Sequence, residues 1–185
     1  MDIVKEVREY VEAECKKPTS KYGYDPFPFH FVPMVGYAEI LADELKADRE
    51  IVVIASWLHD IGSIVSGRQD HHITGARIAE EKLKSLGYPE EKIELVKKCI
   101  FNHRGANNFE RQTIEEKIVS EADVMSNFDN ISGIFMAAFL YEGKNQLEAK
   151  ISAREKLERK WKQLHFEKSK KLIEPKYRAA MLLLK

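Results

Sequence analysis

A histidine and an aspartate, His59-Asp60, stand side by side where an apolar helical segment runs into a glycine. Between Ile51 and Leu58 apolar residues recur at the three-and-four spacing of a buried helical stripe, and His59 continues this stripe inward. A carboxylate beside such a stripe is costly to bury unless a cation or a charged partner compensates it. The dipeptide therefore indicates either a hydrogen-bonded pair at a helix end or a pair of metal ligands.

The other histidines of the chain favour the metal. The chain has six histidines, and His30, His71, His72 and His103, like His59, can be placed at the ends of apolar helical stripes. Asp123 lies on the inward-facing stripe of a further helix. Imidazoles and carboxylates on successive helices form the donor set of a metal site with mixed nitrogen and oxygen ligands.

The order of these residues resembles the HD-domain superfamily of metal-dependent phosphohydrolases. The resemblance extends over about residues 29–129, and Leu58-His59-Asp60-Ile61-Gly62 is its most specific local string. It implies an HD-domain helical bundle that binds metal. The implied ligands of a first metal are His30, His59, Asp60 and Asp123.

Many members of this family have two further histidines that hold a second metal. Here the resemblance implies His71 and His103 for that role. The additional histidine of the family commonly stands four residues before a glycine, which favours His71 because Gly75 follows it. His72 remains the alternative, and whether one or two metals bind stays open.

The periodicity of the chain predicts helices almost throughout and no alternating strand pattern. The fold class is therefore all-α; the resemblance implies an HD-domain helical bundle, to which the chain adds a C-terminal helical hairpin. The expected helices cover residues 2–16, 31–46, 49–62, 72–86, 89–103, 114–128, 131–142, 146–165 and 168–184.

We expect a single HD domain over residues 1–185, with a metal-binding core at about 29–129 and a helical extension at about 142–185. Pro175 is expected to bend or interrupt the last helix. The extension is rich in Lys, Arg and Glu. Its surplus of cations could attract a phosphate-rich partner, but a solvated helix face is the favoured interpretation. Its apolar stripes fit either packing within the chain or a homo-oligomer.

Composition limits the partners and the compartment. The 185 residues include 30 basic and 30 acidic side chains, so nucleic acid is not an expected partner. No apolar run reaches the roughly 20 residues that span a bilayer, so no membrane association is expected. Cys15 and Cys99 have no ligand spacing, and the N-terminus does not resemble a signal peptide. The expected localisation is cytoplasmic.

The expected chemistry follows from the ligand set. Asp60 is the expected bridge and catalytic residue, because one carboxylate can contact two cations that activate a water molecule. A ligand set rich in imidazole suits a divalent transition metal, namely Fe, Mn, Co, Ni or Zn. Arg68 and Arg104 are candidate phosphate-binding residues. The loops 21–29 and 104–112 could border the substrate pocket.

The sequence therefore favours a hydrolase, either a phosphatase or a phosphodiesterase, that acts on a nucleotide or another small phosphate ester through a metal-activated water. Two alternatives remain. Some HD proteins with the same ligand order are di-iron oxygenases, and a non-catalytic binding module stabilised by metal would need the same residues. The ligand order alone does not identify the substrate.

Overall fold

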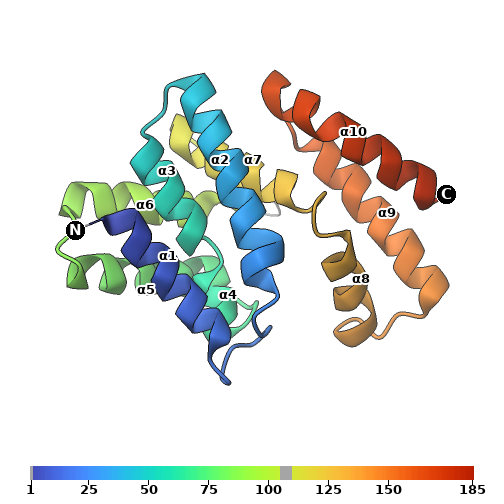
Figure 1. Ribbon diagram of the computed structural model, residues 1–185, viewed down its shortest axis with the longest axis horizontal. Helices are drawn as coiled ribbons and strands as arrows, with labels where there is room; N and C mark the ends of the chain where they lie inside the picture. The colour runs from blue at the N-terminus through green and yellow to red at the C-terminus, as the bar shows by residue number, and fades with distance from the viewer. Residues whose placement is uncertain (1, 105–109) are drawn as a thin grey trace.

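The computed structural model describes residues 2–104 and 110–185 of the chain. Within these residues the protein consists of helices and connecting loops, with no strand, which confirms the predicted all-α class (Figure 1). The elements in chain order are α1 (Ile3–Lys16), the π-helical turn η1 (Phe27–Phe31), α2 (Val32–Leu45), α3 (Arg49–Leu58), α4 (Ile61–Ser66), α5 (His71–Ser85), α6 (Glu90–Asn102), α7 (Ile114–Ser126), α8 (Ile131–Leu140), α9 (Gln146–Lys162) and α10 (Glu167–Leu183).

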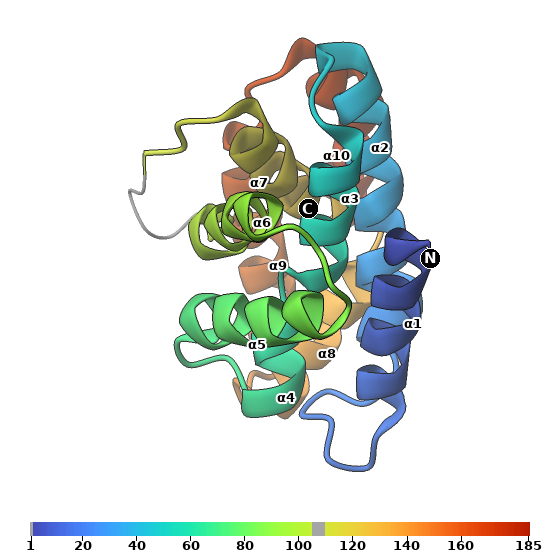
Figure 2. The same ribbon diagram turned by 90° about the vertical axis from the view of Figure 1, so that its left-hand side faces the viewer.

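Helix α3 is the centre of the bundle. Its residues from Ile51 to Leu58 are all buried, and the helix packs against α1, α2, α6 and α7. The paired helices α5 and α6 lie on one side of α3, and α1 and α2 lie on the other (Figure 2). Each buried aliphatic side chain contributes roughly 1.5–3 kcal/mol to folding. The end of α3 is therefore a rigid support for His59.

The expected continuous helix 49–62 is divided at the histidine-aspartate pair, which corrects the sequence prediction. Helix α3 ends at Leu58, and α4 begins at Ile61 with Asp60 as its N-cap residue. Asp60 has φ −110° and ψ 14°, in the sparsely populated bridge region between helix and strand. The chain turns at this point. His59 therefore follows the end of α3 and Asp60 precedes the start of α4, and the two residues lie next to each other.

A close contact between α4 and α5 fixes the next part of the site. A Cβ atom on Gly62 would lie 2.2 Å from the carbonyl oxygen of His71 and 2.6 Å from the backbone nitrogen of Gly75. Only glycine permits this approach of one backbone to another. The contact sets the first turn of α5 directly beside Asp60.

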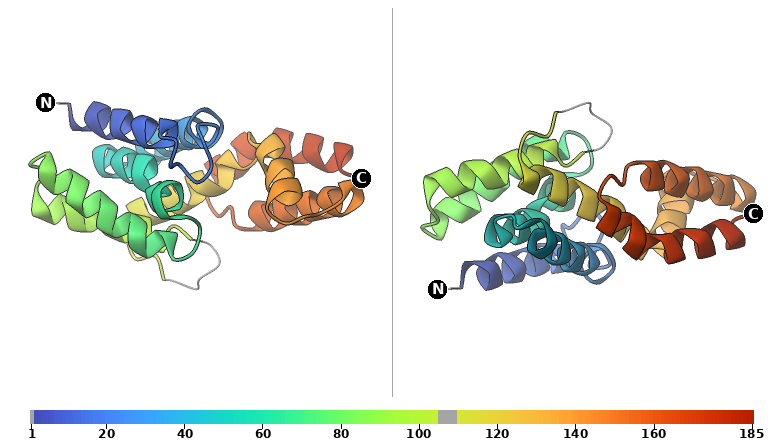
Figure 3. Two further views of the ribbon diagram at one scale, coloured as in Figure 1. Left: turned by 90° about the horizontal axis from the view of Figure 1, so that it is seen from below. Right: turned by 90° about the horizontal axis from the view of Figure 1, so that it is seen from above.

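The C-terminal helices form a separate layer next to the bundle. Helices α9 and α10 lie side by side as the predicted hairpin (Figure 3), and the rings of Trp161 and Tyr177 stack between them at 4.7 Å. Pro175 lies inside α10 without interrupting it, so that alternative of the sequence prediction is wrong. Helix α9 also packs against α7 and α8, which places it beside the helix that carries Asp123.

Among the residues that the structure describes, no single helix is long and apolar enough to cross a membrane. One bent pair, residues 49–66 and 71–85 at 112°, passes that test together by length and composition alone. The first member of this pair contains α3, whose residues are largely buried in the interior of the protein.

Candidate metal centre

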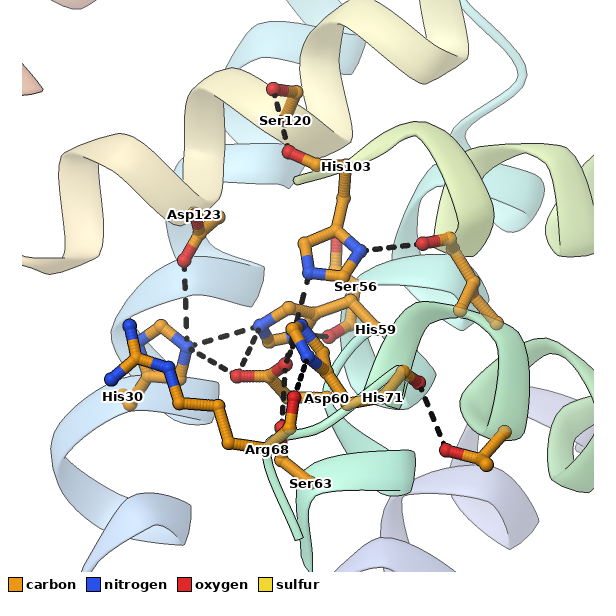
Figure 4. A network of polar contacts seen from close by, with 12 residues as sticks. His30, Ser56, His59, Asp60, Ser63, Arg68, His71, His103, Ser120 and Asp123 are labelled. Atoms are coloured by element: carbon orange, nitrogen blue, oxygen red, sulfur yellow. Dashed lines mark hydrogen bonds and ion pairs between the residues drawn. The ribbon is translucent and has the colours of Figure 1, made fainter. Parts of the chain in front are cut away.

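Four imidazoles and two carboxylates meet between the helices of the bundle (Figure 4). Each comes from a different place in the chain, at or near a helix end. They are His30 in η1, His59 after α3, Asp60 before α4, His71 at the start of α5, His103 after α6 and Asp123 in α7. The structure thus brings together all six of the ligands that the sequence predicted.

Asp60 stands between two pairs of imidazoles. Its Oδ2 lies 3.8 Å from His30 Nε2 and 3.5 Å from His59 Nε2. Its Oδ1 lies 3.3 Å from His71 Nε2 and 3.7 Å from His103 Nε2. His30, His59 and Asp60 form one group whose donor atoms lie within 4.8 Å of one another, and Asp60, His71 and His103 form a second. One carboxylate is therefore shared by two potential cation sites.

Backbone carbonyls orient three of the imidazoles. The Nδ1 atom of His59 contacts the carbonyl oxygen of Ser56 at 2.9 Å, and Nδ1 of His71 contacts that of Arg68 at 2.8 Å. Nδ1 of His103 contacts the carbonyl of Ile100 in the same way. A carbonyl oxygen only accepts, so each Nδ1 carries the proton and donates it. Each Nε2 lone pair then faces the centre, as metal ligation requires.

A hydroxyl orients the fourth imidazole. Ser126 Oγ donates to the carbonyl oxygen of Asp123 at 2.8 Å, so it accepts from His30 Nδ1–H at 2.9 Å. His30 Nε2 and His59 Nε2 are consequently two lone pairs that face each other at 3.0 Å. Two acceptors at this distance need a positive charge between or beside them. A divalent cation fits this donor set, since two nitrogens about 2.1 Å from one ion are about 3 Å apart when they bind at right angles.

Electrostatics keep the cluster in its cation-binding form. Burial, reinforced by the neighbouring His59, lowers the pKa of His30 and of His103 to about 4. Burial alone would raise the pKa of Asp60, but the surrounding imidazoles, of which His59 acts most strongly, lower it to about 2. At neutral pH His30 and His103 are therefore neutral and Asp60 is ionised. These are the protonation states that metal binding needs.

Asp123 is held by a lysine that the sequence analysis missed. Its Oδ1 lies 3.6 Å from His30 Nε2, and its Oδ2 accepts a hydrogen bond from Lys160 Nζ at 3.1 Å. Burial would raise the pKa of Asp123, but Lys160 and then His30 hold it far below its usual range. Lys160 belongs to α9, in the C-terminal hairpin. The ion pair orients Asp123 and leaves Oδ1 directed at the imidazoles.

His71, and not His72, enters the cluster. The His72 ring lies against Phe101, with ring centres 5.1 Å apart, whereas His71 Nε2 faces Asp60. Both residues are buried in the first turn of α5. They point to different sides because adjacent helical residues are about 100° apart around the axis. The geometry agrees with the preference given by the glycine spacing.

A pocket of about 1020 Å³ opens onto the cluster. Arg68 and Arg104, the predicted phosphate-binding residues, both line it. Tyr22 and Phe29 of the predicted loop also border it, whereas Phe27 stacks on Trp57 in the core. Of the second predicted loop, residues 105–109 lie outside the described residues.

The pocket has a further wall that the sequence analysis assigned to solvent. Helix α9 contributes one face of side chains, spaced at three, four and seven residues. They are Lys156, Arg159, Lys160 and Gln163. This spacing was readable in the sequence, but nothing there indicated that the face borders a pocket.

Known proteins share the sequence and the fold. A tRNA (cytidine(56)-2'-O)-methyltransferase of Picrophilus torridus is 30% identical over 125 residues, which are 60% of this chain and 34% of that protein. The chain thus spans about a third of the length of this curated relative. Among solved structures, Bacillus subtilis YpgQ in complex with ADP has a TM-score of 0.71 at 21% identity, covering 97% of this chain and 92% of that one. The Lin1889 protein from Listeria innocua has a TM-score of 0.74 at 16% identity, covering 99% and 92%.

Likeness at such low identity shows the fold alone, so the family rests on the sequence match. The HD domain family matches residues 29–127, which is more than half of the 185 residues. The matched segment begins just before His30, contains the His59-Asp60 pair, and ends after Asp123. The chain belongs to the HD-domain family.

Proposed function

We propose that the protein is a metal-dependent phosphohydrolase that acts on a nucleotide or another small phosphate ester. The observation that carries the proposal is the position of Asp60, whose two oxygens face two different pairs of imidazoles. The family assignment supports hydrolase chemistry. The complex of the structurally similar YpgQ with ADP supports a nucleotide as the first substrate class to test.

His30, His59, Asp60 and Asp123 would hold one cation, and Asp60, His71 and His103 a second. A donor set of imidazole nitrogens and carboxylate oxygens suits Fe, Mn, Co, Ni or Zn. When bound, such cations supply charge for a phosphate oxygen and lower the pKa of a water molecule. The residues of the chain hold this set in place, since every ligating imidazole has its outer nitrogen engaged in a hydrogen bond.

Side-chain nucleophiles are disfavoured by the surroundings of the nearest candidates. Ser63 Oγ donates to Asp60 Oδ1 at 3.3 Å and therefore faces a carboxylate, with no imidazole placed to remove its proton. Ser56 is fully buried, and burial raises the pKa of the Cys99 thiol far above neutrality. We therefore expect water to be the nucleophile and substitution of Ser56 or Cys99 to leave turnover nearly unchanged.

The test uses full-length protein from which metal has been removed and to which single metals have been returned. Phosphate release is measured over a panel of nucleotides and simple phosphate esters, with elemental analysis of bound metal. Asp60→Ala should lose most bound metal and at least 100-fold of the activity, since it removes a ligand of both cations. Asp43→Ala is the control, because Asp43 is exposed and forms an ion pair with Arg49 on the surface.

Three results would contradict the proposal. Turnover that survives complete metal removal would exclude the mechanism. Wild-type metal content in Asp60→Ala would exclude the bridging role of the carboxylate. A product that forms only in the presence of dioxygen would indicate the oxygenase chemistry found in some HD proteins. Hydrolysis in water labelled with oxygen-18 should place the label on the released phosphate if phosphorus is attacked.

A further inference from the structure

More cationic side chains line the pocket than the one lysine that pairs with a candidate metal ligand. Lys160 is paired with Asp123. Lys156 and Arg159 of α9, and Arg68 from the loop before α5, also line the pocket. None of these three side chains makes an ion pair or a side-chain hydrogen bond within residues 2–104 and 110–185. In that part of the chain no carboxylate pairs closely with these three side chains, although Asp123 and Glu142 act on Lys156 from a greater distance.

Lys156 is the most informative of these cations. It is only partly exposed, although Lys side chains are usually almost fully solvated. Burial, together with the positive charges of Lys160 and Arg68, lowers the pKa of Lys156 to about 8. A partly buried ammonium group next to two like charges is unfavourable in the free protein. A bound anion would reverse this cost.

Lys156 lies apart from the metal ligands. It precedes Lys160 by one turn of α9, a rise of about 6 Å along the helix axis. Lys160 pairs with Asp123 directly, whereas Lys156 makes no such pair and stands further along the pocket wall, where Asp123 and then Glu142 of the segment after α8 supply weaker opposing charges. In the view of Figure 4 the Arg68 side chain extends from beside Asp60 toward His30.

We propose that Lys156 and Arg68 bind a second phosphate group of the substrate, beside the phosphate held at the metal centre. The substrate is then an organic diphosphate or triphosphate, and a phosphate monoester fills only half of the site. A guanidinium group binds two phosphate oxygens at once, and an ammonium group adds a point charge. This inference rests on the proposed function and specifies its substrate class.

The first test measures binding without turnover. Methylenediphosphonate and methylphosphonate, which resist hydrolysis, are titrated calorimetrically into dialysed, metal-loaded protein. The wild type should bind the diphosphonate at least tenfold more tightly. Lys156→Met should weaken diphosphonate binding about tenfold and methylphosphonate binding less than about threefold, because it removes one charge-assisted contact. Lys162→Met is the matched control, since Lys162 is exposed on the same helix and does not line the pocket.

Arg68→Met provides a second test should Lys156→Met fail to fold. Arg68 is exposed, so its replacement should leave the fold intact. Like Lys156→Met, it should weaken diphosphonate binding more than methylphosphonate binding. In kinetics, Lys156→Met should lower kcat/KM for a nucleoside diphosphate about tenfold and leave that for the monophosphate within about threefold.

Two results would overturn the subsite. The first is equal affinity of the wild type for the two phosphonates. The second is an equal loss of affinity for both phosphonates in the variants, which a general effect of charge would produce. A protein that hydrolyses no phosphate ester, yet binds the diphosphonate more tightly through Lys156, would refute the proposed function and leave the subsite standing.

Discussion

In the metal-free protein, acidification from pH 7 to pH 5 should weaken the fold substantially. Burial lowers the pKa of His30 and of His103 to about 4. In the unfolded chain a histidine titrates near 6.5. Between these values the unfolded state binds more protons than the folded state, so the free energy of unfolding falls as the pH falls. The loss begins near pH 6.5 and is complete near pH 4.

The magnitude follows from the two pKa values. At pH 5 an unfolded histidine is almost fully protonated, and a folded one with a pKa of about 4 is almost neutral. At 1.36 kcal/mol per pKa unit, each residue then costs about 2 kcal/mol relative to pH 7. His30 and His103 together cost about 4 kcal/mol, a large part of a typical stability of 5–15 kcal/mol. Asp60 adds nothing in this window, because its stabilising ionisation is lost only below about pH 4.

Urea unfolding at pH 7 and pH 5, followed by circular dichroism in the presence of EDTA, measures this difference. His103→Gln should reduce it by about 2 kcal/mol, because one of the two titrating groups is gone. Metal-loaded protein should be more stable at pH 7 and should release its metal on acidification, since protons and cations compete for Nε2. A wild-type free energy of unfolding that agrees within about 1 kcal/mol at both pH values would refute the reasoning.

Substitutions at three further positions test how the candidate ligands are held. Lys160→Met should weaken metal binding about tenfold because it releases Asp123 Oδ2, and Lys160→Arg should restore most of the affinity. Competition with a chelator measures both affinities. Equal metal affinities of the wild type and Lys160→Met would exclude a positioning role for Lys160. Ser126→Ala should weaken binding by a similar factor, because it removes the acceptor for His30 Nδ1, and an unchanged affinity would mean that the hydroxyl does not fix this ring. Gly62→Ala should cost about 1–3 kcal/mol and reduce the metal content, because its Cβ would lie 2.2 Å from the His71 carbonyl; an unchanged melting temperature would contradict this contact.

The candidate ligand set was predictable because each of its residues extends a pattern visible in the sequence. His103 completes an apolar stripe of α6, and Asp123 lies on the inner stripe of α7. A helix that buries one face carries any polar residue on that face into the interior. The ordered spacing then related these positions to one family. The sequence therefore predicted the donors but could not give the distances between them.

The local backbone of the site was less predictable. Phe27–Phe31 winds as a π-helical turn, closed by the hydrogen bond from Val32 N–H to the Phe27 carbonyl, and it carries His30. The break between α3 and α4 at Asp60 is a similar adjustment of a single turn. Periodicity averages over several turns, so it does not detect a change confined to one residue. Gly62 was the available signal, since it marks the close approach of α4 to α5.

The cationic wall of α9 was not predictable for a different reason. Lys156, Arg159 and Lys160 share one helical face, and a solvated face has the same pattern. The direction in which the hairpin docks on the bundle decides whether this face is solvated or borders the pocket. That direction is set by contacts distant in sequence, the hydrogen bonds that join Tyr37 and Asp129 to Lys176 of the hairpin.

These docking contacts link the hairpin to the chemistry of the bundle. Tyr37 donates to Asp129 at 2.6 Å, and Lys176 of α10 contacts both residues. The hairpin is thereby fixed to α2 and to the end of α7, the helix that carries Asp123. Because Lys160 holds Asp123 from the hairpin side, the position of α9 determines both the orientation of this candidate metal ligand and the charge of the pocket wall. A change that loosens the hairpin should therefore weaken metal binding and anion binding together, although no hairpin residue is itself a metal ligand.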